Sequence, residues 1–222
     1  MKKIINPRIK ICCISSIEEA KTAIELGASA LGLVSEMPSG PGVITMENIK
    51  HIAAYVPPPI ATFLLTSKQD INEIIKQHRF CRTNTIQICD NLKIGTHNEL
   101  KNALPGIAIV QVIHVTGRES IAKALAIQND VDAILLDSGD QSKQIKELGG
   151  TGRTHNWEIS CEIREKLDIP IFLAGGIKPD NITLAIEQVH PFGIDLCSGV
   201  RTDDKLDKIK LTELFYNVNK GI

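Results

Sequence analysis

Two residues capable of proton transfer stand where apolar segments of the chain end. Asp137 follows the apolar run 133–136 and opens a polar, glycine-rich loop. A carboxylate in such a place suits acid–base chemistry, although an aspartate that caps a helix or anchors a loop is also common there. Cys12 ends the first apolar segment and could supply a thiolate, although a buried free cysteine is more often a small hydrophobic residue.

Cys12 has a second thiol beside it, Cys13, in the segment 8–14, whose composition is typical of a strand. Successive strand side chains point to opposite faces, so only one of the two thiols is expected to line a barrel mouth. Lys10, Cys12 and Ile14 share one face, and the other face is more apolar and suits the layer beneath the helices. The pattern therefore predicts that Cys12 points to the interior.

Two later strand ends carry glycines that suit an anion. Gly175 and Gly176 follow one apolar run, and Ser198 and Gly199 follow the next. Glycine lets the backbone approach a ligand, and helix-terminal N–H groups favour a phosphate. Each turn alone could be a tight structural connection. Two in adjacent units favour a phosphate site, because parallel barrels often use these loops for one.

The loop after Asp137 contains Gly150, Thr151, Gly152 and Arg153. It is either a flexible connection or a backbone cradle and cover over a site. It is not a P-loop, because no Gly-Lys-Ser/Thr ending follows.

Three further side chains are weaker candidates. His114 ends an apolar run and His155 lies in the long loop, but isolated histidines are more often structural. Trp157 is expected to anchor the following helix by packing.

Short apolar runs alternate with amphipathic segments along the whole chain. The eight expected strands are residues 8–14, 28–34, 60–65, 85–89, 107–115, 133–136, 170–174 and 193–196. Each is followed by a predicted helix, the last near 205–218, and nearly continuous apolar strands are typical of a parallel sheet covered on both faces. No linker divides the units, so residues 1–222 are expected to form one domain, an α/β fold of the (β/α)8 TIM-barrel class. A doubly wound open sheet is the rival, disfavoured by the absence of Gly-x-Gly-x-x-Gly after the first strand.

Bulk composition excludes several functional classes. The chain has 222 residues, 43% hydrophobic and 23% charged, with a formal net charge of −1. Neither nucleic acid nor a membrane is an expected partner, because no charge excess and no long apolar run is present. The residues after Met1 do not form a secretory signal, so a cytoplasmic location is expected. The six cysteines have no regular spacing and are expected to be reduced, with no metal site.

Several sequence blocks, in order, resemble the phosphoribosylanthranilate isomerase family of tryptophan biosynthesis. The blocks are Lys10-Ile11-Cys12, residues 28–34, Leu135-Leu136-Asp137-Ser138, residues 149–154 with Trp157, residues 173–181 and residues 193–200. The likeness spans nearly the whole chain, and the last three blocks in series are quite specific.

The resemblance implies an aldose–ketose isomerase, an intramolecular oxidoreductase that carries out an Amadori rearrangement. Asp137 would be the general acid on the furanose oxygen, and Cys12, as thiolate, would remove the proton from C2. The expected partner is a phosphorylated sugar substrate, with no cofactor and no metal, in a monomer or homodimer. A neighbouring cation could lower the pKa of Cys12, and Lys10 lies on the same face.

The chain departs from the family pattern in three places. The loop Ser35–Val43 lacks the family's arginine, which helps hold the anthranilate carboxylate, and Arg153 or Lys178 could compensate. The family's fourth-strand block appears as Gln87-Ile88-Cys89-Asp90, and Cys13 stands at the family's glycine. Two alternatives therefore stay open: a divergent paralogue acting on another phosphorylated sugar amine, and a non-catalytic barrel that binds a phosphorylated ligand.

Overall fold

A computed structural model describes residues 6–142, 145–150 and 152–220 of the protein. Eight parallel strands close into a barrel in chain order, so that the eighth pairs with the first. These strands are β1 (Arg8–Ile11), β2 (Ala30–Val34), β3 (Ala61–Thr66), β4 (Thr85–Ile88), β5 (Ala108–His114), β6 (Ala133–Asp137), β7 (Ile171–Leu173) and β8 (Gly193–Leu196). The predicted (β/α)8 fold is confirmed.

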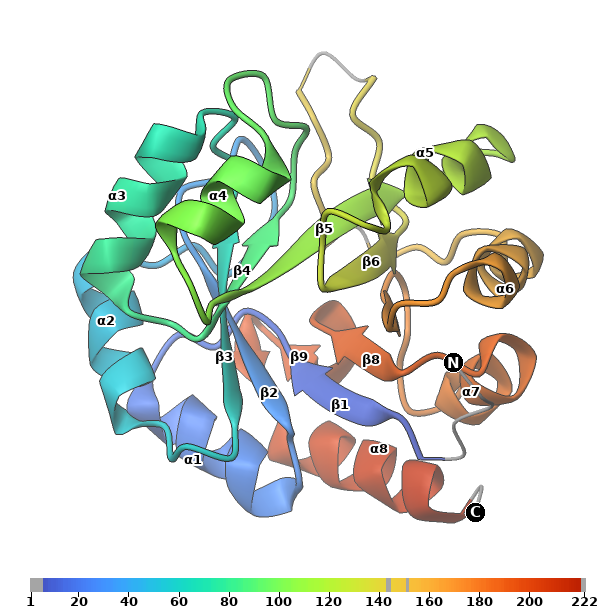
Figure 1. The fold of residues 1–222 in the computed structure, drawn as a ribbon. Helices are drawn as coiled ribbons and strands as arrows, with labels where there is room; N and C mark the ends of the chain where they lie inside the picture. The colour runs from blue at the N-terminus through green and yellow to red at the C-terminus, as the bar shows by residue number, and fades with distance from the viewer. Residues whose placement is uncertain (1–5, 143–144, 151, 221–222) are drawn as a thin grey trace.

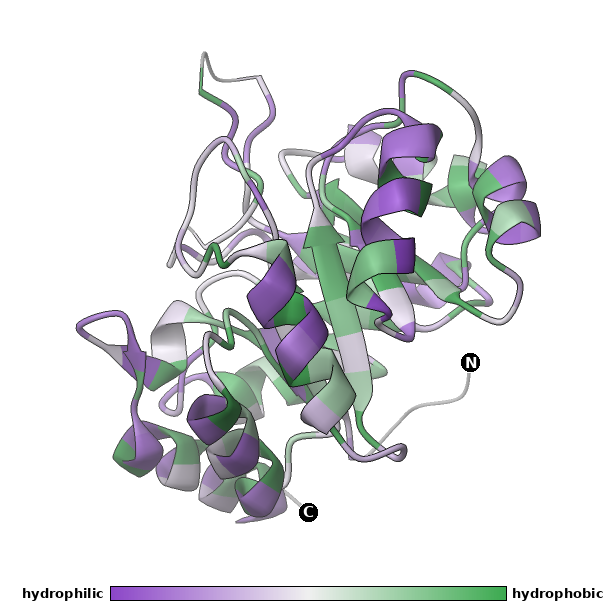
Figure 2. Cartoon of the chain, turned by 90° about the vertical axis from the view of Figure 1, so that its left-hand side faces the viewer, coloured by the Kyte–Doolittle hydropathy of each residue, from purple (hydrophilic) through white to green (hydrophobic). Residues whose placement is uncertain are grey.

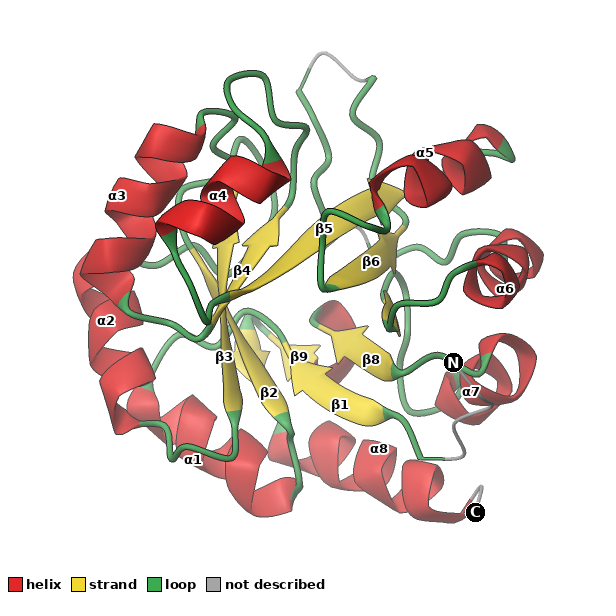
Figure 3. Ribbon diagram, in the orientation of Figure 1, coloured by secondary structure: helices red, strands yellow, loops and turns green. Residues whose placement is uncertain are grey.

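Helices surround the barrel and form its outer layer (Figures 1 and 3). They are α1 (Ile17–Leu26), α2 (Met46–Tyr55), α3 (Ile71–Cys81), α4 (His97–Ala103), α5 (Glu119–Ile127), α6 (Trp157–Lys166), α7 (Ile182–Val189) and α8 (Lys208–Lys220). Among the described residues, no helix is long and apolar enough to cross a bilayer.

Local sequence signals set the helix ends. Ser16 caps α1 by accepting a hydrogen bond from the Glu19 amide at 3.2 Å, and Gly27 ends the helix in the left-handed conformation. Thr45 caps α2 in the same way by accepting from the Asn48 amide. Such caps satisfy amides that have no partner inside the helix, so they fix where each connecting loop begins.

The strands separate two apolar layers. On β2, Leu31 and Leu33 pack outward beneath the helices, whereas Ala30 and Val34 face the barrel interior. In Figure 2 the strands in the middle of the molecule are mostly green, and the helices around them alternate between green and purple. This alternation aims every second strand residue at the barrel axis, and the last such residues reach its open mouth.

Two features differ from the expectation. β1 ends at Ile11 rather than at Ile14, because Cys13 adopts a left-handed backbone with φ 63°. A short 3-10 turn, η1 (Ser198–Val200), and a small antiparallel hairpin, β9 (Arg201–Thr202) with β10 (Lys205–Leu206), follow β8. The last helix consequently begins at Lys208.

The hairpin is tied to the start of α1 by a buried ion pair. Arg201 contacts Glu19 at 3.0 Å, with side chains 6% and 14% exposed. The Glu19 carboxylate also accepts hydrogen bonds from the Leu206 and Ser15 amides, at 2.8 and 2.9 Å. Burial alone would raise the pKa of Glu19, but Arg201 and these amides lower it below its usual value. The pair therefore holds the loops after β1 and β8 together.

Replacing Arg201 by methionine leaves Glu19 partly buried without its cation. We expect the free energy of unfolding, measured by urea denaturation, to fall by about 3 kcal/mol. The exposed pair of Lys21 and Glu25, 62% and 59% exposed, provides a control. Lys21→Met should lower the free energy of unfolding by less than about 1 kcal/mol. Equally small losses in the two variants would show that the Arg201 pair does not stabilise the fold.

Candidate functional site

A cavity of about 670 Å³ opens where the strands end at their carboxyl side. Cys12 follows β1 and Asp137 ends β6, and both line this cavity. The loops after β2, β6, β7 and β8 complete its wall.

Asp137 is buried at the cavity wall and 8% exposed. Its Oδ1 accepts a hydrogen bond from the Ser138 amide at 2.7 Å. Its Oδ2 lies against Gly149, where an added Cβ would come within 2.9 Å of that oxygen. Burial raises the pKa of Asp137 above its usual value, although His114 and the Ser138 amide oppose the rise. A carboxyl whose pKa is raised in this way suits a general acid.

Cys12 has the opposite shift. Its thiol is 5% exposed, yet its pKa is lowered below the usual value for a thiol. The neighbouring Cys13 side chain is the largest cause, and the positive charge of Lys10 adds to it, whereas burial and Asp195 act against ionisation. A thiolate so stabilised suits a general base.

The cation beneath Cys12 is held by a second strand. Lys10 is fully buried, and its Nζ lies 2.8 Å from Asp195 Oδ1, in register across β1 and β8. The ammonium also lies 5.1 Å from the centre of the Phe63 ring, a cation–π contact. Burial alone would lower the pKa of Lys10, but Asp195 and Cys12 raise it above its usual value. Lys10 therefore stays charged.

The expectation that only one of the two adjacent thiols reaches the cavity is wrong. Cys12 and Cys13 both line the cavity, and Ile14 packs in the outer layer instead of sharing the Cys12 face. Alternation holds only while the backbone stays extended, and β1 ends at Ile11. The left-handed turn at Cys13 brings its side chain back to the mouth.

Most of the residues predicted to bind phosphate gather at one end of the cavity. Gly175, Gly176 and Ser198 line it. Gly175 and Gly176 have φ of 84° and 63°, which disfavours any side chain there. Gly199 packs instead against the turn after β7, where an added Cβ would collide with the Ile177 carbonyl oxygen. Its predicted role in phosphate binding stays untested.

The loop after β6 covers the cavity and contacts the loop after β2. Gly150 and Gly152 line the cavity, and Gly150 packs against Pro41. Thr151 lies outside the described residues. The Arg153 side chain forms an ion pair with Glu147 and is not among the lining residues. Figure 1 shows this loop, in yellow, projecting beyond the barrel.

Comparison with known proteins agrees with this arrangement. The sequence profile of the N-(5'-phosphoribosyl)anthranilate (PRA) isomerase family matches residues 9–217. The chain belongs to this family. N-(5'-phosphoribosyl)anthranilate isomerase 2 of Methanosarcina mazei is 32% identical over 211 residues, which cover 94% of this chain and 92% of that protein. The enzyme of Methanocella arvoryzae is 30% identical over 208 residues, covering 94% and 95%. The crystal structure of the Thermotoga maritima enzyme superimposes with a TM-score of 0.81 at 26% identity, covering 96% of this chain and 99% of that one.

The loop after β2, which lacks the arginine that the resemblance led us to expect, is tied to the loop after β6. Its Ser39 hydroxyl donates to the Lys146 carbonyl oxygen at 2.6 Å, which ties it to the loop after β6. Of the described residues that line the cavity, none is lysine or arginine. Lys146 contacts Asp90 at 2.5 Å, and Lys68 lies 3.7 Å from Glu36.

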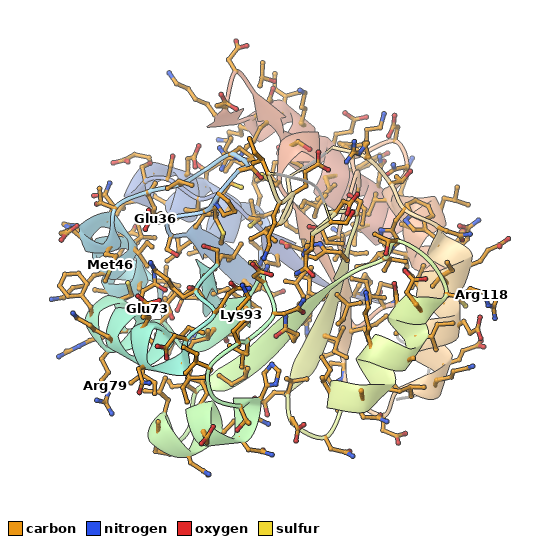
Figure 4. The ribbon with its side chains drawn as sticks, turned by 90° about the horizontal axis from the view of Figure 1, so that it is seen from above. Glu36, Met46, Glu73, Arg79, Lys93 and Arg118 are labelled. Atoms are coloured by element: carbon orange, nitrogen blue, oxygen red, sulfur yellow. The ribbon has the colours of Figure 1, made fainter. Side chains whose placement is uncertain are left out.

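Lysine side chains outside this loop line a second pocket. Glu36, Glu73 and Lys93, labelled in Figure 4, line it together with Lys68 and Lys146. Of the two residues named as possible replacements for the arginine, Lys178 pairs with Asp180 at 3.1 Å and Arg153 with Glu147.

The other candidates fall into two groups. Cys89 lines the cavity, and His114 Nε2 lies 3.1 Å from the Cys89 carbonyl oxygen, behind it. His155 forms a hydrogen bond with the Ser160 hydroxyl at 2.6 Å, and burial lowers its pKa to about 4. Both observations indicate a structural role for His155. Trp157 begins α6 and packs against the outer apolar layer, as predicted.

Among the other lining residues, sequence reasoning assigned no role to the polar side chains of Gln87, Asp195 and Cys197. Asp195 alone gave a usable signal, since it is a carboxylate inside an otherwise apolar strand.

Charge changes at Lys10 and Asp195 should move the pKa of Cys12 in opposite directions. Lys10→Met removes the cation, so the acidic limb of the kcat/KM profile should move to higher pH by about one unit. Asp195→Asn removes an anion that opposes the thiolate, so that limb should move to lower pH. Steady-state kinetics across the pH range measures both, because kcat/KM reports the free enzyme.

If the pair has a purely structural role, both variants should lose activity, and the acidic limb of each profile should stay at its wild-type pH. Movement of the acidic limb in the same direction in both variants would contradict the electrostatic account.

Proposed function

We propose that the protein isomerises N-(5'-phosphoribosyl)anthranilate to the 1-(carboxyphenylamino)-1-deoxyribulose phosphate, a step of tryptophan biosynthesis. The order of strands around the barrel carries the proposal. β7 and β8 lie between β6, which bears Asp137, and β1, which leads to Cys12. A phosphate held by the loops after β7 and β8 would therefore place the attached ribose between the acid and the base.

The two shifted groups divide the chemistry. Asp137 donates its proton to the furanose oxygen, the C1–O bond breaks, and the nitrogen lone pair forms a C1=N bond. The Cys12 thiolate then takes the proton from C2, and those electrons form an enolamine and neutralise the nitrogen. The enol loses its hydroxyl proton while C1 gains one, which yields the ketose. These side chains or solvent supply and accept every proton that moves. The six cysteines are all free thiols, which suits the reducing environment of the cytoplasm.

The remaining wall of the cavity suits an aromatic ring. Val34, Met37, Leu65 and Leu148 line it away from the glycines of β7 and β8. Small-molecule pockets are lined mostly by apolar side chains, and such a wall favours the binding of a flat aromatic ring. The described lining has no cation for a ring carboxylate, and this observation favours a second candidate substrate, another phosphorylated sugar amine.

Turnover of phosphoribosylanthranilate, followed by loss of its fluorescence, tests the proposed reaction. We expect the wild-type protein to turn the substrate over, and Cys12→Ala and Asp137→Asn each to lower kcat by about 100-fold or more. The half-buried thiol of Cys161 on α6, outside the cavity, provides a control, and Cys161→Ser should retain full activity.

A folded wild-type protein that leaves the substrate unchanged would overturn the proposed substrate. The same assay with a phosphoribosyl arylamine that lacks the carboxylate would then test the second candidate. Full activity in Asp137→Asn would exclude this residue as the acid.

A further inference from the structure

The buried carboxylate of Asp90, which follows β4, holds the loop after β6. Its Oδ2 accepts a hydrogen bond from the Lys146 ammonium at 2.5 Å, and its Oδ1 accepts one from the Gln141 side-chain amide at 3.2 Å. The backbone amide of Asn91 donates to the same Oδ1 at 2.8 Å, which fixes the orientation of the carboxylate. Both oxygens of this one carboxylate therefore bind residues of the loop after β6.

The same part of that loop is also held from the opposite side. The carbonyl oxygen of Lys146 accepts a hydrogen bond from the Ser39 hydroxyl, in the loop after β2, at 2.6 Å. The next residue, Glu147, pairs through its backbone with Asp140, at N–O distances of 2.9 and 3.0 Å. Lys146 is thus fixed through its side chain by the loop after β4 and through its backbone by the loop after β2.

Lys146 lies three residues before Gly149, which covers the Asp137 carboxyl. An added Cβ at Gly149 would lie 2.9 Å from Asp137 Oδ2. Leu148 lies between them in the chain, is 5% exposed and packs in the inner apolar layer. Three residues of chain span at most about 11 Å, so an anchor at Lys146 limits where Leu148 and Gly149 can lie. Displacement of this short stretch would let water reach Asp137.

Other titratable groups also face Asp137 or share its cavity. They are His114 on β5, Lys10 on β1, Asp195 on β8, Cys89 after β4 and Cys12 after β1. In the loop after β6 itself, Glu147 forms an ion pair with Arg153. A substitution at Asp90 or Lys146 removes none of these groups. It can therefore affect Asp137 either through the position of the loop or through its own change of charge.

We propose that Asp90 is a positioning residue that, through Lys146, holds Leu148 and Gly149 over the Asp137 carboxyl and keeps water away from it. This inference deepens the proposed function, because Asp137 is the proposed acid. Asp90 and Lys146 both lie outside the cavity lining, so they act on the site through the loop.

Carbon NMR titration of the aspartate carboxyl carbons tests the inference without substrate, and the Asp137 signal is identified by its loss in Asp137→Asn. Lys146→Met removes a cation, whose charge alone would raise the pKa of Asp137 on removal. Asp90→Asn removes an anion, whose charge alone would lower that pKa on removal. Positioning through the loop predicts one direction for both variants, because each lets water reach a carboxyl whose pKa is raised by burial. We expect the Asp137 midpoint to fall by about one pH unit in each.

Two further variants serve as controls. Lys146→Arg retains a cation that can bind Asp90, so its Asp137 midpoint should stay near that of wild type. Lys68→Met is the matched control, because Lys68 lines the same second pocket and lies 3.7 Å from Glu36, which is 84% exposed. Its Asp137 midpoint should equal that of wild type.

Wild-type midpoints in both Lys146→Met and Asp90→Asn would overturn the proposal. A rise in Lys146→Met together with a fall in Asp90→Asn would overturn it as well, because those shifts would follow from charge alone. The Lys146 side chain is 34% exposed, so Lys146→Met keeps the test available if Asp90→Asn does not fold. A rise or no change in Lys146→Met would then overturn the proposal by itself. Failure of the proposed isomerase reaction would appear in turnover and would leave these midpoints unchanged.

Discussion

A negative charge on a buried thiol is the constraint on which the site depends. Cys12 is 5% exposed, and an ion at that depth is strongly disfavoured unless nearby groups stabilise it. The Lys10 ammonium supplies the charge, and the closure of the barrel between β1 and β8 brings Asp195 beside it to hold it. Gly32 on β2 leaves the space, because an added Cβ would lie 2.7 Å from the Cys12 sulfur and 3.1 Å from the Lys10 nitrogen.

The same closed mouth shifts the pKa values of Asp137 and Cys12, the proposed acid and base, in opposite directions. Burial favours the neutral form of Asp137, and His114 and the Ser138 amide hydrogen bond do not offset it. Cys12 is buried to a similar degree, but the neighbouring Cys13 side chain and an ammonium reverse the effect. Burial alone would favour the neutral form of both groups, so the neighbours decide which of them is suited to the proposed role of base. Pairs of groups whose shifts diverge in this way are typical of acid–base sites.

Local pattern was sufficient to predict the eight strands and the placement of Cys12 and Asp137 at strand ends, because each depends on residues a few positions apart. The pairs Lys10–Asp195 and Glu19–Arg201 join the two ends of the chain, and no local pattern specifies them. The orientation of Cys13 was predicted wrongly because the alternation rule was extended past the end of β1.

Infrared difference spectroscopy of the ligand-free protein at neutral pH tests the central claim most directly, because it detects the protonation states themselves. The account predicts a protonated-carboxyl band in wild type that disappears in Asp137→Asn. It also predicts that Cys12→Ala has the same S–H bands as wild type, because an ionised Cys12 contributes none. A spectrum with an ionised Asp137 and an S–H band assigned to Cys12 would contradict it.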